Sequence, residues 1–190
     1  AGDRGLCGTY NRNVGAVAEQ YIEEVGCQVQ VIAIGEKACQ RAERNYWNLI
    51  RTYPELSAME DADVAGEVAR DIRTMFDEGR FEVLQMVYTE FIGVSDRQAV
   101  SEQILPVPRA EAVEDEQLEY IFEPDAEVFL ERLLPMAVEA RIAYNLVQSL
   151  ASEHAARMIA MRSASDNAED MKDDLTRQLN RARQQKITRE

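Results

Sequence analysis

Short apolar runs alternate with amphipathic stretches over roughly the first two-thirds of the chain. Apolar residues at helical spacing predict a helix over 14–25, and Gly26 marks its end. The mostly apolar run over 29–34 predicts a short strand, which Gly35 closes. A second helix is predicted over 36–44. The order of these elements, helix, strand, helix, is typical of an α/β protein.

The next stretch combines an unpatterned segment with an amphipathic one. Residues 46–54 follow neither period and are predicted to be irregular. A helix is predicted over 62–76, and Gly79 ends it. Its apolar face consists of Val64, Val68, Ile72 and Met75.

Two further apolar runs predict an antiparallel hairpin. Its strands cover 81–94 and 98–107, with a tight turn at Ser95 and Asp96 between them. Residues 109–117 are acidic and lack an apolar period, so they are expected to form an exposed loop. A last edge strand is predicted from three alternating residues, Leu118, Tyr120 and Phe122.

These elements predict one α/β domain with a mixed sheet over residues 1–122. The first residues read as a loop that leaves an element outside the sequence, because Gly2 and Gly5 enclose Asp3 and Arg4. We therefore expect the first strand of the sheet to lie upstream of Ala1, and treat the chain as part of a longer protein.

A long helix is predicted for the second domain, residues 123–190. Pro124 suits a helix start, no glycine follows it, and Pro135 is the one interior breaker, where a bend is expected. About 65 helical residues would extend about 98 Å. A broad apolar face is predicted to pack on the first domain, formed by Leu130, Leu133, Leu134, Ala137, Val138, Tyr144 and Val147.

The apolar stripe narrows in the C-terminal part of this helix. Its members follow one another in steps of three or four, the spacing of a coiled-coil seam. Such a seam needs a partner helix, and residues 1–122 contain none of that length. The partner must be another chain or the upstream segment. The predicted seam consists of Met161, Ala164, Ala168, Met171, Leu175, Leu179 and Ala182.

Charge is also unevenly distributed along the chain. The formal net charge is −14, of which residues 1–150 carry −15 and residues 151–190 carry +1. Such an acidic body argues against nucleic-acid binding. The basic tip from Arg177 onward either complements the helix dipole or meets acidic loops of a partner. No run of about 18 apolar residues exists, so no direct membrane insertion is expected.

Candidate catalytic chemistry is sparse. The glycines between Gly2 and Gly8 fit neither a phosphate loop nor a dinucleotide fingerprint, and a tight turn is favoured. His154 is the only histidine and is expected to lie at a surface or interface. Cys7, Cys27 and Cys39 lack metal-ligand spacing and are expected to be reduced thiols, unless the fold brings two of them together. No catalytic residue, metal site or cofactor is predicted.

Two motifs resemble one known family. The sequence DRGLCGTYN (Asp3–Asn11) is similar to the segment after the first strand of the γ subunit of F-type ATP synthases. The sequence ASEHAARMIAMRSASDNAED (151–170), followed by LNRARQQKIT (179–188), resembles the signature on that subunit's long C-terminal helix. The resemblance is collinear over essentially the whole chain.

This resemblance implies a Rossmann-like α/β domain whose long C-terminal helix forms an antiparallel coiled coil with an N-terminal helix absent from this sequence. It implies a rotor, or central stalk, that couples proton-driven rotation of the c-subunit ring to ATP synthesis on the β subunits. The implied partners are the α and β subunits, the ε subunit and the c ring. The implied location is peripheral, on the cytoplasmic face of a bacterial membrane or its organellar equivalent, and such a subunit has no active site or cofactor of its own.

The resemblance also assigns contacts with acidic loops of the β subunit to four residues near the helix end. They are Arg183, Gln184, Asn180 and Thr188. Leu179 departs from the Tyr that the family usually has before the Asn. Residues 106–118 contain no Cys, so no thiol switch of the photosynthetic type is expected.

Two other functions remain open at this stage. One is a structural adaptor, an α/β module that self-associates through the stripe over 161–182. The other is a doubly wound enzyme with a ligand near Gly2–Gly8. The gene sequence upstream of Ala1 separates the adaptor from the rotor, and nucleotide calorimetry tests the enzyme.

Overall fold

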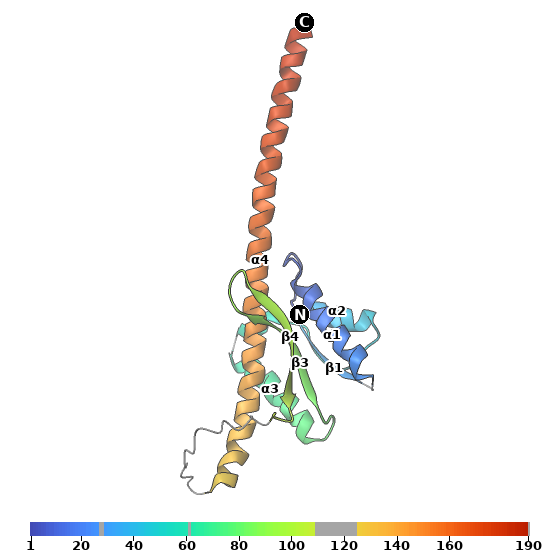
Figure 1. Ribbon diagram of the computed structural model, residues 1–190, viewed down its shortest axis with the longest axis vertical. Coiled ribbons are helices and arrows are strands. Elements are labelled where there is room, and N and C mark those ends of the chain that lie inside the picture. The colour runs from blue at the N-terminus through green and yellow to red at the C-terminus, as the bar shows by residue number, and fades with distance from the viewer. Residues whose placement is uncertain (27–28, 61, 109–124, 190) are drawn as a thin grey trace.

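The computed structural model describes residues 1–26, 29–60, 62–108 and 125–189. It consists of a small α/β body and one long C-terminal helix that runs along the body and projects far beyond it (Figure 1). This arrangement confirms the predicted fold class, a mixed α/β protein with a long C-terminal helix. The boundary expected between 122 and 123 lies outside the described residues, as do the loop over 109–117 and the edge strand over 118–122.

The helices of the body agree well with the sequence pattern. Helix α1 covers Tyr10–Val25, four residues more at its start than predicted, and ends at Gly26, which adopts the left-handed conformation. Helix α2 covers Glu36–Arg44 and α3 covers Ala62–Asp77. A short 3₁₀ turn, η1 (Ser57–Glu60), precedes α3.

The first strand pair corrects one prediction. Strand β1 (Gln30–Ile34) pairs in parallel with β2 (Asn48–Tyr53), within the stretch expected to be irregular. The pattern misses β2 because polar residues such as Asn48 and Arg51 interrupt its apolar alternation, and none of its side chains is fully buried.

The hairpin is confirmed, with shorter strands than expected. Strands β3 (Leu84–Phe91) and β4 (Arg97–Leu105) pair antiparallel. The connection closes through Gly93 and Asp96, whose backbones exchange two hydrogen bonds of 2.9 and 3.1 Å. Beyond Leu105, Pro106 has no N–H with which to extend the ladder.

The described strands form two separate two-stranded sheets, one parallel and one antiparallel, where a single mixed sheet was expected. The body's main core lies between α3, the strands and the first half of the long helix. Its buried residues are Leu56, Ala65, Val68, Ala69, Ile72, Met75, Ile104, Leu105, Val138, Ile142, Leu146 and Leu150. The predicted apolar face of α3 contributes to this core.

Helix α4 covers Ala126–Arg189, 64 residues, and continues through Pro135. At 1.5 Å per residue it is about 96 Å long. The face expected to pack on the body is wrong for Leu130, Leu133 and Tyr144, among others, which are exposed. Val138 of the predicted face is buried, but the buried face also contains polar residues, which apolar spacing could not select. The buried face consists of Val138, Ile142, Asn145, Leu146, Ser149, Leu150, Ser152 and Glu153.

Gly35 provides a test of how the N-terminal segment meets the body. Gly35 has φ +89°, and a Cβ built there would lie 1.8 Å from the carbonyl oxygen of Ala1. We expect Gly35→Ala to lower the free energy of unfolding by at least about 2 kcal/mol, because both the backbone and the contact would have to shift. Thermal unfolding followed by circular dichroism measures the loss.

The matched control is Gly66→Ala within α3, where a Cβ would meet nothing within 4 Å. Alanine is the better helix former by up to about 1 kcal/mol, so this variant should be neutral or more stable. Equal destabilisation of the two variants would show that the approach of Ala1 to Gly35 is unimportant.

Candidate functional site: the projecting helix and its anchorage

The C-terminal part of α4 leaves the body and carries apolar residues into solvent. Every residue from Met161 to Thr188 is exposed, and Met171 and Leu175 are 69% and 64% exposed. Exposed apolar residues in a continuous row on one helix mark a surface that a partner covers. None of the described helices is long and apolar enough to cross a lipid bilayer.

The seven predicted seam residues all lie on this projecting part. At about 100° per residue, the positions from Met161 to Ala182 fall within an arc of about 80° on an ideal helix. A stripe this narrow fits one partner helix. Whether they pair with such a helix stays a prediction.

Three of the four residues predicted to contact a partner's acidic loops lie away from the stripe. On the same ideal helix Gln184 is directly opposite the stripe, with Asn180 and Thr188 one turn to either side of it along the same ridge. Arg183 borders the stripe. The Thr188 hydroxyl donates to the Gln184 carbonyl oxygen, 2.8 Å away. A helix bound at the stripe would therefore leave Asn180, Gln184 and Thr188 accessible.

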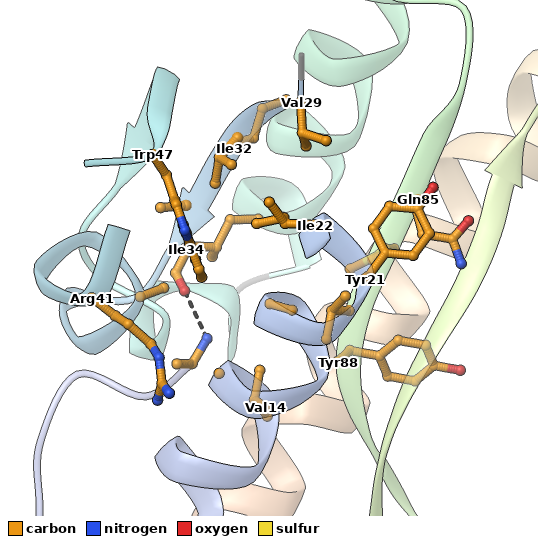
Figure 2. Close-up of a pocket in the computed structure, with 18 of the residues that line it drawn as sticks. Val14, Tyr21, Ile22, Val29, Ile32, Ile34, Arg41, Trp47, Gln85 and Tyr88 are labelled. Atoms are coloured by element: carbon orange, nitrogen blue, oxygen red, sulfur yellow. Dashed lines mark hydrogen bonds between the residues drawn. The ribbon is translucent and has the colours of Figure 1, made fainter. Parts of the chain in front are cut away.

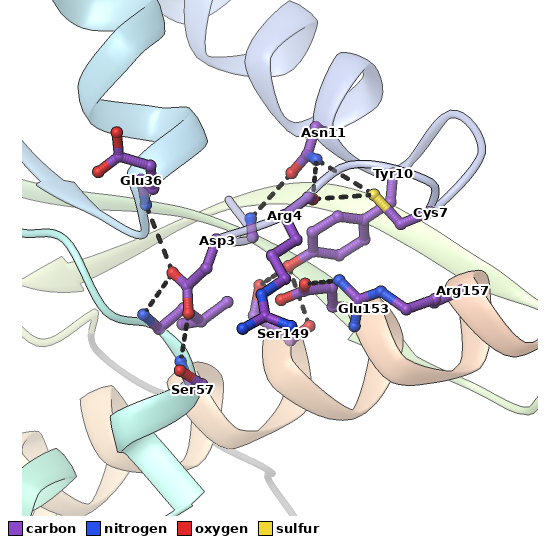
Figure 3. A network of polar contacts seen from close by, with 12 residues as sticks. Asp3, Arg4, Cys7, Tyr10, Asn11, Glu36, Ser57, Ser149, Glu153 and Arg157 are labelled. Carbon is purple, nitrogen blue, oxygen red and sulfur yellow. Dashed lines mark hydrogen bonds and ion pairs between the residues drawn. The ribbon is translucent and has the colours of Figure 1, made fainter.

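The N-terminal loop is fastened to the body through Asp3 (Figure 3). Its carboxylate accepts hydrogen bonds from the backbone amides of Leu56 at 2.7 Å and Ser57 at 2.8 Å, and more weakly from Glu36 at 3.4 Å. Burial by itself would raise the pKa of Asp3, but these amide donors outweigh it and lower the pKa below 3.8. The carboxylate thus joins the N-terminal loop to the start of α2 and to η1.

Tyr10 then joins this loop to α4. Its hydroxyl lies 2.9 Å from both the carbonyl oxygen and the hydroxyl of Ser149. Burial raises the pKa of Tyr10, so the phenol remains a donor. On the next turn Glu153, 3% exposed, pairs with Arg157 and lies against Gly2, where an added Cβ would be 2.5 Å from its carboxyl carbon.

The same turns of α4 bind the outer edge of β3. The backbone amide of Thr89 donates to the Ser149 hydroxyl at 3.4 Å, and that of Phe91 donates to the Gln148 side chain at 2.9 Å. The Ser152 hydroxyl donates to the Thr89 carbonyl oxygen at 3.2 Å. Polar side chains of a helix therefore complete the hydrogen bonding at this end of the strand.

Ion pairs fasten the next turns of α4 to the hairpin and to α3. Arg141 pairs with Glu102 of β4, which also accepts from Asn145 at 3.1 Å and from the Tyr88 hydroxyl at 3.0 Å. Burial raises the pKa of Glu102, but the bonds from Arg141, Tyr88 and Asn145 outweigh it, so its pKa is lowered. Arg73 of α3 pairs with Glu139 at 2.8 Å.

The histidine and cysteine residues lie in different surroundings. His154 is exposed, whereas its neighbour Glu153 is buried in the anchorage. Cys7 and Cys39 are buried, and Cys27 lies outside the described residues. Within the described ranges, no three His, Cys, Asp or Glu side chains are grouped to hold a metal ion. The arrangement supports mechanical anchorage of a helix.

Sequence reasoning did not assign this anchorage, although its motif was visible. The segment Asp3–Asn11 carried the family resemblance, but its spacing could not show that Asp3 and Tyr10 bind elements far along the chain. Nothing in the helical pattern around Ser149 and Ser152 indicates their contacts. Polar residues at the i, i+3 spacing within an otherwise apolar helix face are the signal that could have indicated them.

Comparison with known proteins decides the family. A family model described as ATP synthase matches residues 1–190. The chain belongs to this ATP synthase family. Curated relatives named ATP synthase gamma chain include those of Pelotomaculum thermopropionicum, 38% identical over 189 residues, and Desulforamulus reducens, 35% identical over 189 residues. Both alignments cover 99% of this chain and 66% of the relative, so this family member spans just under two-thirds of their length.

Solved structures of the ATP synthase family share the fold. The rotor of the Euglena gracilis mitochondrial ATP synthase matches with a TM-score of 0.67 and 17% identity, over 98% of this chain and 72% of that one. The central stalk and c ring of the Tetrahymena thermophila mitochondrial enzyme gives a TM-score of 0.62 and 22% identity, over 87% and 73%. The family model and the curated relatives confirm the family expected from the two sequence motifs.

The Asp3 contacts predict a pH-dependent effect on stability. We expect Asp3→Asn to lower the free energy of unfolding by about 1–3 kcal/mol at neutral pH, because an amide cannot replace the charged acceptor of several backbone donors. A carboxylate with a lowered pKa in the folded state stabilises above pH 3.8 and loses this contribution as pH falls through the folded pKa. Urea unfolding should therefore show a smaller difference from wild type at about pH 3.

Glu55→Gln is the matched control, because Glu55 is an exposed carboxylate just before the same loop. It should change stability little at either pH. A deficit of Asp3→Asn that is the same at both pH values would contradict a role for the charge of Asp3.

Proposed function

We propose that this chain is the rotor, or central-stalk, part of a proton-translocating F-type ATP synthase. In this role it couples rotation of the membrane c ring to ATP synthesis on the β subunits. The observation that carries the proposal is one uninterrupted helix, α4, anchored along its first half and projecting with an uncovered apolar stripe along its second. The relatives named ATP synthase gamma chain support it independently.

The arrangement suits the transmission of torque. Moving one charge through 100 mV releases about 2.3 kcal/mol, so the work of several protons must be delivered along the shaft for each ATP. A turning shaft must not slip in its base. Hydrogen bonds and ion pairs from α1, α3, β3 and β4 all reach α4 between Glu139 and Ser152, which holds the base of the helix on several sides.

The proposal includes a second shaft helix. The apolar stripe over 161–182 would pair antiparallel with an N-terminal helix of the full-length protein. Apolar residues near the start of α4, including Phe129 and Met136, are exposed as well and would extend that contact. The α and β subunits would then surround the coiled coil, with Arg183, Gln184, Asn180 and Thr188 facing acidic loops of the β subunit. The ε subunit and the c ring would contact the body.

In this role the chain has no active site, and nucleotide chemistry takes place on the α and β subunits. The protein would be peripheral on the cytoplasmic face of a bacterial membrane. An affinity pull-down of the full-length tagged protein from its own solubilised membranes tests the assembly. Recovery of α, β and ε chains supports the rotor, whereas recovery of the protein alone would favour a self-associating adaptor.

Two classes of variant of the full-length protein separate the faces of the shaft. Leu175→Asp places a charge in the seam, and we expect it to lower the thermal midpoint and helix content, since burying an unpaired charge and losing a packed leucine costs at least about 2 kcal/mol. Gln184→Asp, on the opposite face, should leave unfolding unchanged. Circular dichroism of both variants measures the difference.

Variants of the residues proposed to contact the β subunit are expected to affect the coupling of ATP hydrolysis to proton pumping. In the reassembled complex, Arg183→Ala with Gln184→Ala should reduce ATP hydrolysis coupled to proton pumping severalfold, because each charged or polar contact contributes about 1 kcal/mol or more. Proton pumping in membrane vesicles measures it. Normal coupling in this variant would exclude these two residues as contacts with the β subunit.

A further inference from the structure

The apolar side chains with which α4 packs on the body repeat every four residues. This apolar row consists of Val138, Ile142, Leu146 and Leu150, all of them buried. Side chains four residues apart form a ridge along a helix surface. A shift of α4 by four residues, about 6 Å along its axis, would therefore place each apolar side chain where its neighbour in the row now lies.

The surroundings of the apolar row do little to prevent such a shift. In the same core, α3 contributes apolar and mostly small side chains, namely Ala65, Val68, Ala69 and Ile72. Ile142 and Leu146 also line the cavity of about 920 Å³ between β1 and β3, beneath α1 (Figure 2). In an outward shift, the exposed Leu134 would take the place of Val138 as Leu150 left the core. Because apolar contacts have no direction, this row by itself distinguishes poorly between the two positions.

A neighbouring row of α4 is polar, and its members are not interchangeable. This polar row consists of Arg141, Asn145 and Ser149, also four residues apart. Arg141 is exposed and pairs with Glu102 of β4. Asn145 is fully buried, and its amide donates to the Glu102 carboxylate at 3.1 Å and to the Met86 sulfur at 3.8 Å. The three side chains therefore differ in size, in exposure and in the groups that they bind.

Ser149 occupies the narrowest place in the polar row. Its side chain is buried, and its hydroxyl lies 2.9 Å from the Tyr10 hydroxyl and 3.4 Å from the backbone nitrogen of Thr89. An outward shift by four residues would press the larger Asn145 into this place. It would also move Arg141 into the buried place of Asn145 and take its guanidinium out of water. Both changes are unfavourable, because a close-packed site does not accept a larger side chain and a buried charge loses its hydration.

We propose that the polar row of Arg141, Asn145 and Ser149 sets the axial register of α4 on the body. Without this row, the helix would also occupy a second position, displaced outward by four residues. The three residues are positioning residues, since they act by selecting one of two packings of the same apolar row. Setting the register is a known use of polar residues within apolar helix interfaces. The register is a property of the fold and does not depend on the proposed function.

Two further contacts of α4 lie outside the polar row and constrain the register less. The ion pair between Arg73 and Glu139 is partly exposed to solvent, so it contributes little. The Ser152 hydroxyl donates to the Thr89 carbonyl oxygen. After an outward shift, Gln148 would take the place of Ser152, and its amide is also a donor. Replacement of the polar row is therefore the direct test of the register.

Pulsed electron paramagnetic resonance of the full-length protein measures the register. Spin labels on noncanonical amino acids at Gln103 of β4 and at Ser163 of the projecting part of α4, both exposed, report the distance between body and helix. The wild-type protein should give one distance. Replacing all three residues of the polar row by alanine should add a second distance, about 6 Å longer. A single, unchanged distance in the folded triple variant would overturn the proposal.

The matched control removes an anchoring contact outside the polar row. Arg73→Ala combined with Glu139→Ala breaks the ion pair of 2.8 Å between α3 and α4. This variant should keep the single wild-type distance, because the polar row is intact. A second distance in the control as well would mean that any loss of anchorage lets the helix move, and would overturn the specific role of the polar row.

Two exchange variants give a second measurement that applies even if the triple variant does not fold. Val138→Leu with Leu146→Val exchanges two members of the apolar row, and Asn145→Ser with Ser149→Asn exchanges two members of the polar row. Both keep the composition of the full-length protein. The apolar exchange should lower the thermal midpoint by less than about 3 °C, and the polar exchange by at least about 6 °C, because only the polar places are specific. Equal shifts would overturn the proposal.

Discussion

The anchorage of α4 is the constraint on which the rest of the structure depends. Between Glu139 and Ser152 this helix supplies one side of the core and also the partners for a strand edge, two ion pairs and a buried tyrosine. The core of the body is therefore incomplete without the helix, and the same contacts hold the helix in one rotational position relative to the body. Anchorage of this kind combines apolar packing, which gives most of the stability, with directional bonds that fix the rotation of the helix about its axis.

Helices and the hairpin could be predicted because their signals are local. The bounds of α2 were predicted correctly, and α3 shows the apolar period of a helix packed on one face. Strand β2 could not be predicted, because Asn48 and Arg51 point away from any core and remove the alternation. The packing face of α4 was predicted on the wrong side for a related reason: the side with more leucine is the exposed one.

The site was only partly readable from sequence. The stripe could be predicted from spacing alone, and all of its residues are exposed in the structure. The roles of Asp3, Tyr10 and Ser149 could not be derived in that way, because each depends on a contact between segments more than fifty residues apart. The cavity between β1 and β3 illustrates a further limit. Its lining residues have the apolar pattern of ordinary core positions. Only the three-dimensional structure shows that they enclose a cavity of about 920 Å³.

The uninterrupted helix fixes how its two ends are oriented relative to each other. Because α4 has no break between the anchored turns and the stripe, the direction in which the stripe points is fixed by residue count. Counted from the anchored face, the stripe is offset by only about 60° on an ideal helix. One residue added or removed between Arg157 and Met161 would turn the stripe by about 100° relative to the body. The length of this segment therefore sets the angle about the helix axis between the anchored face and the stripe.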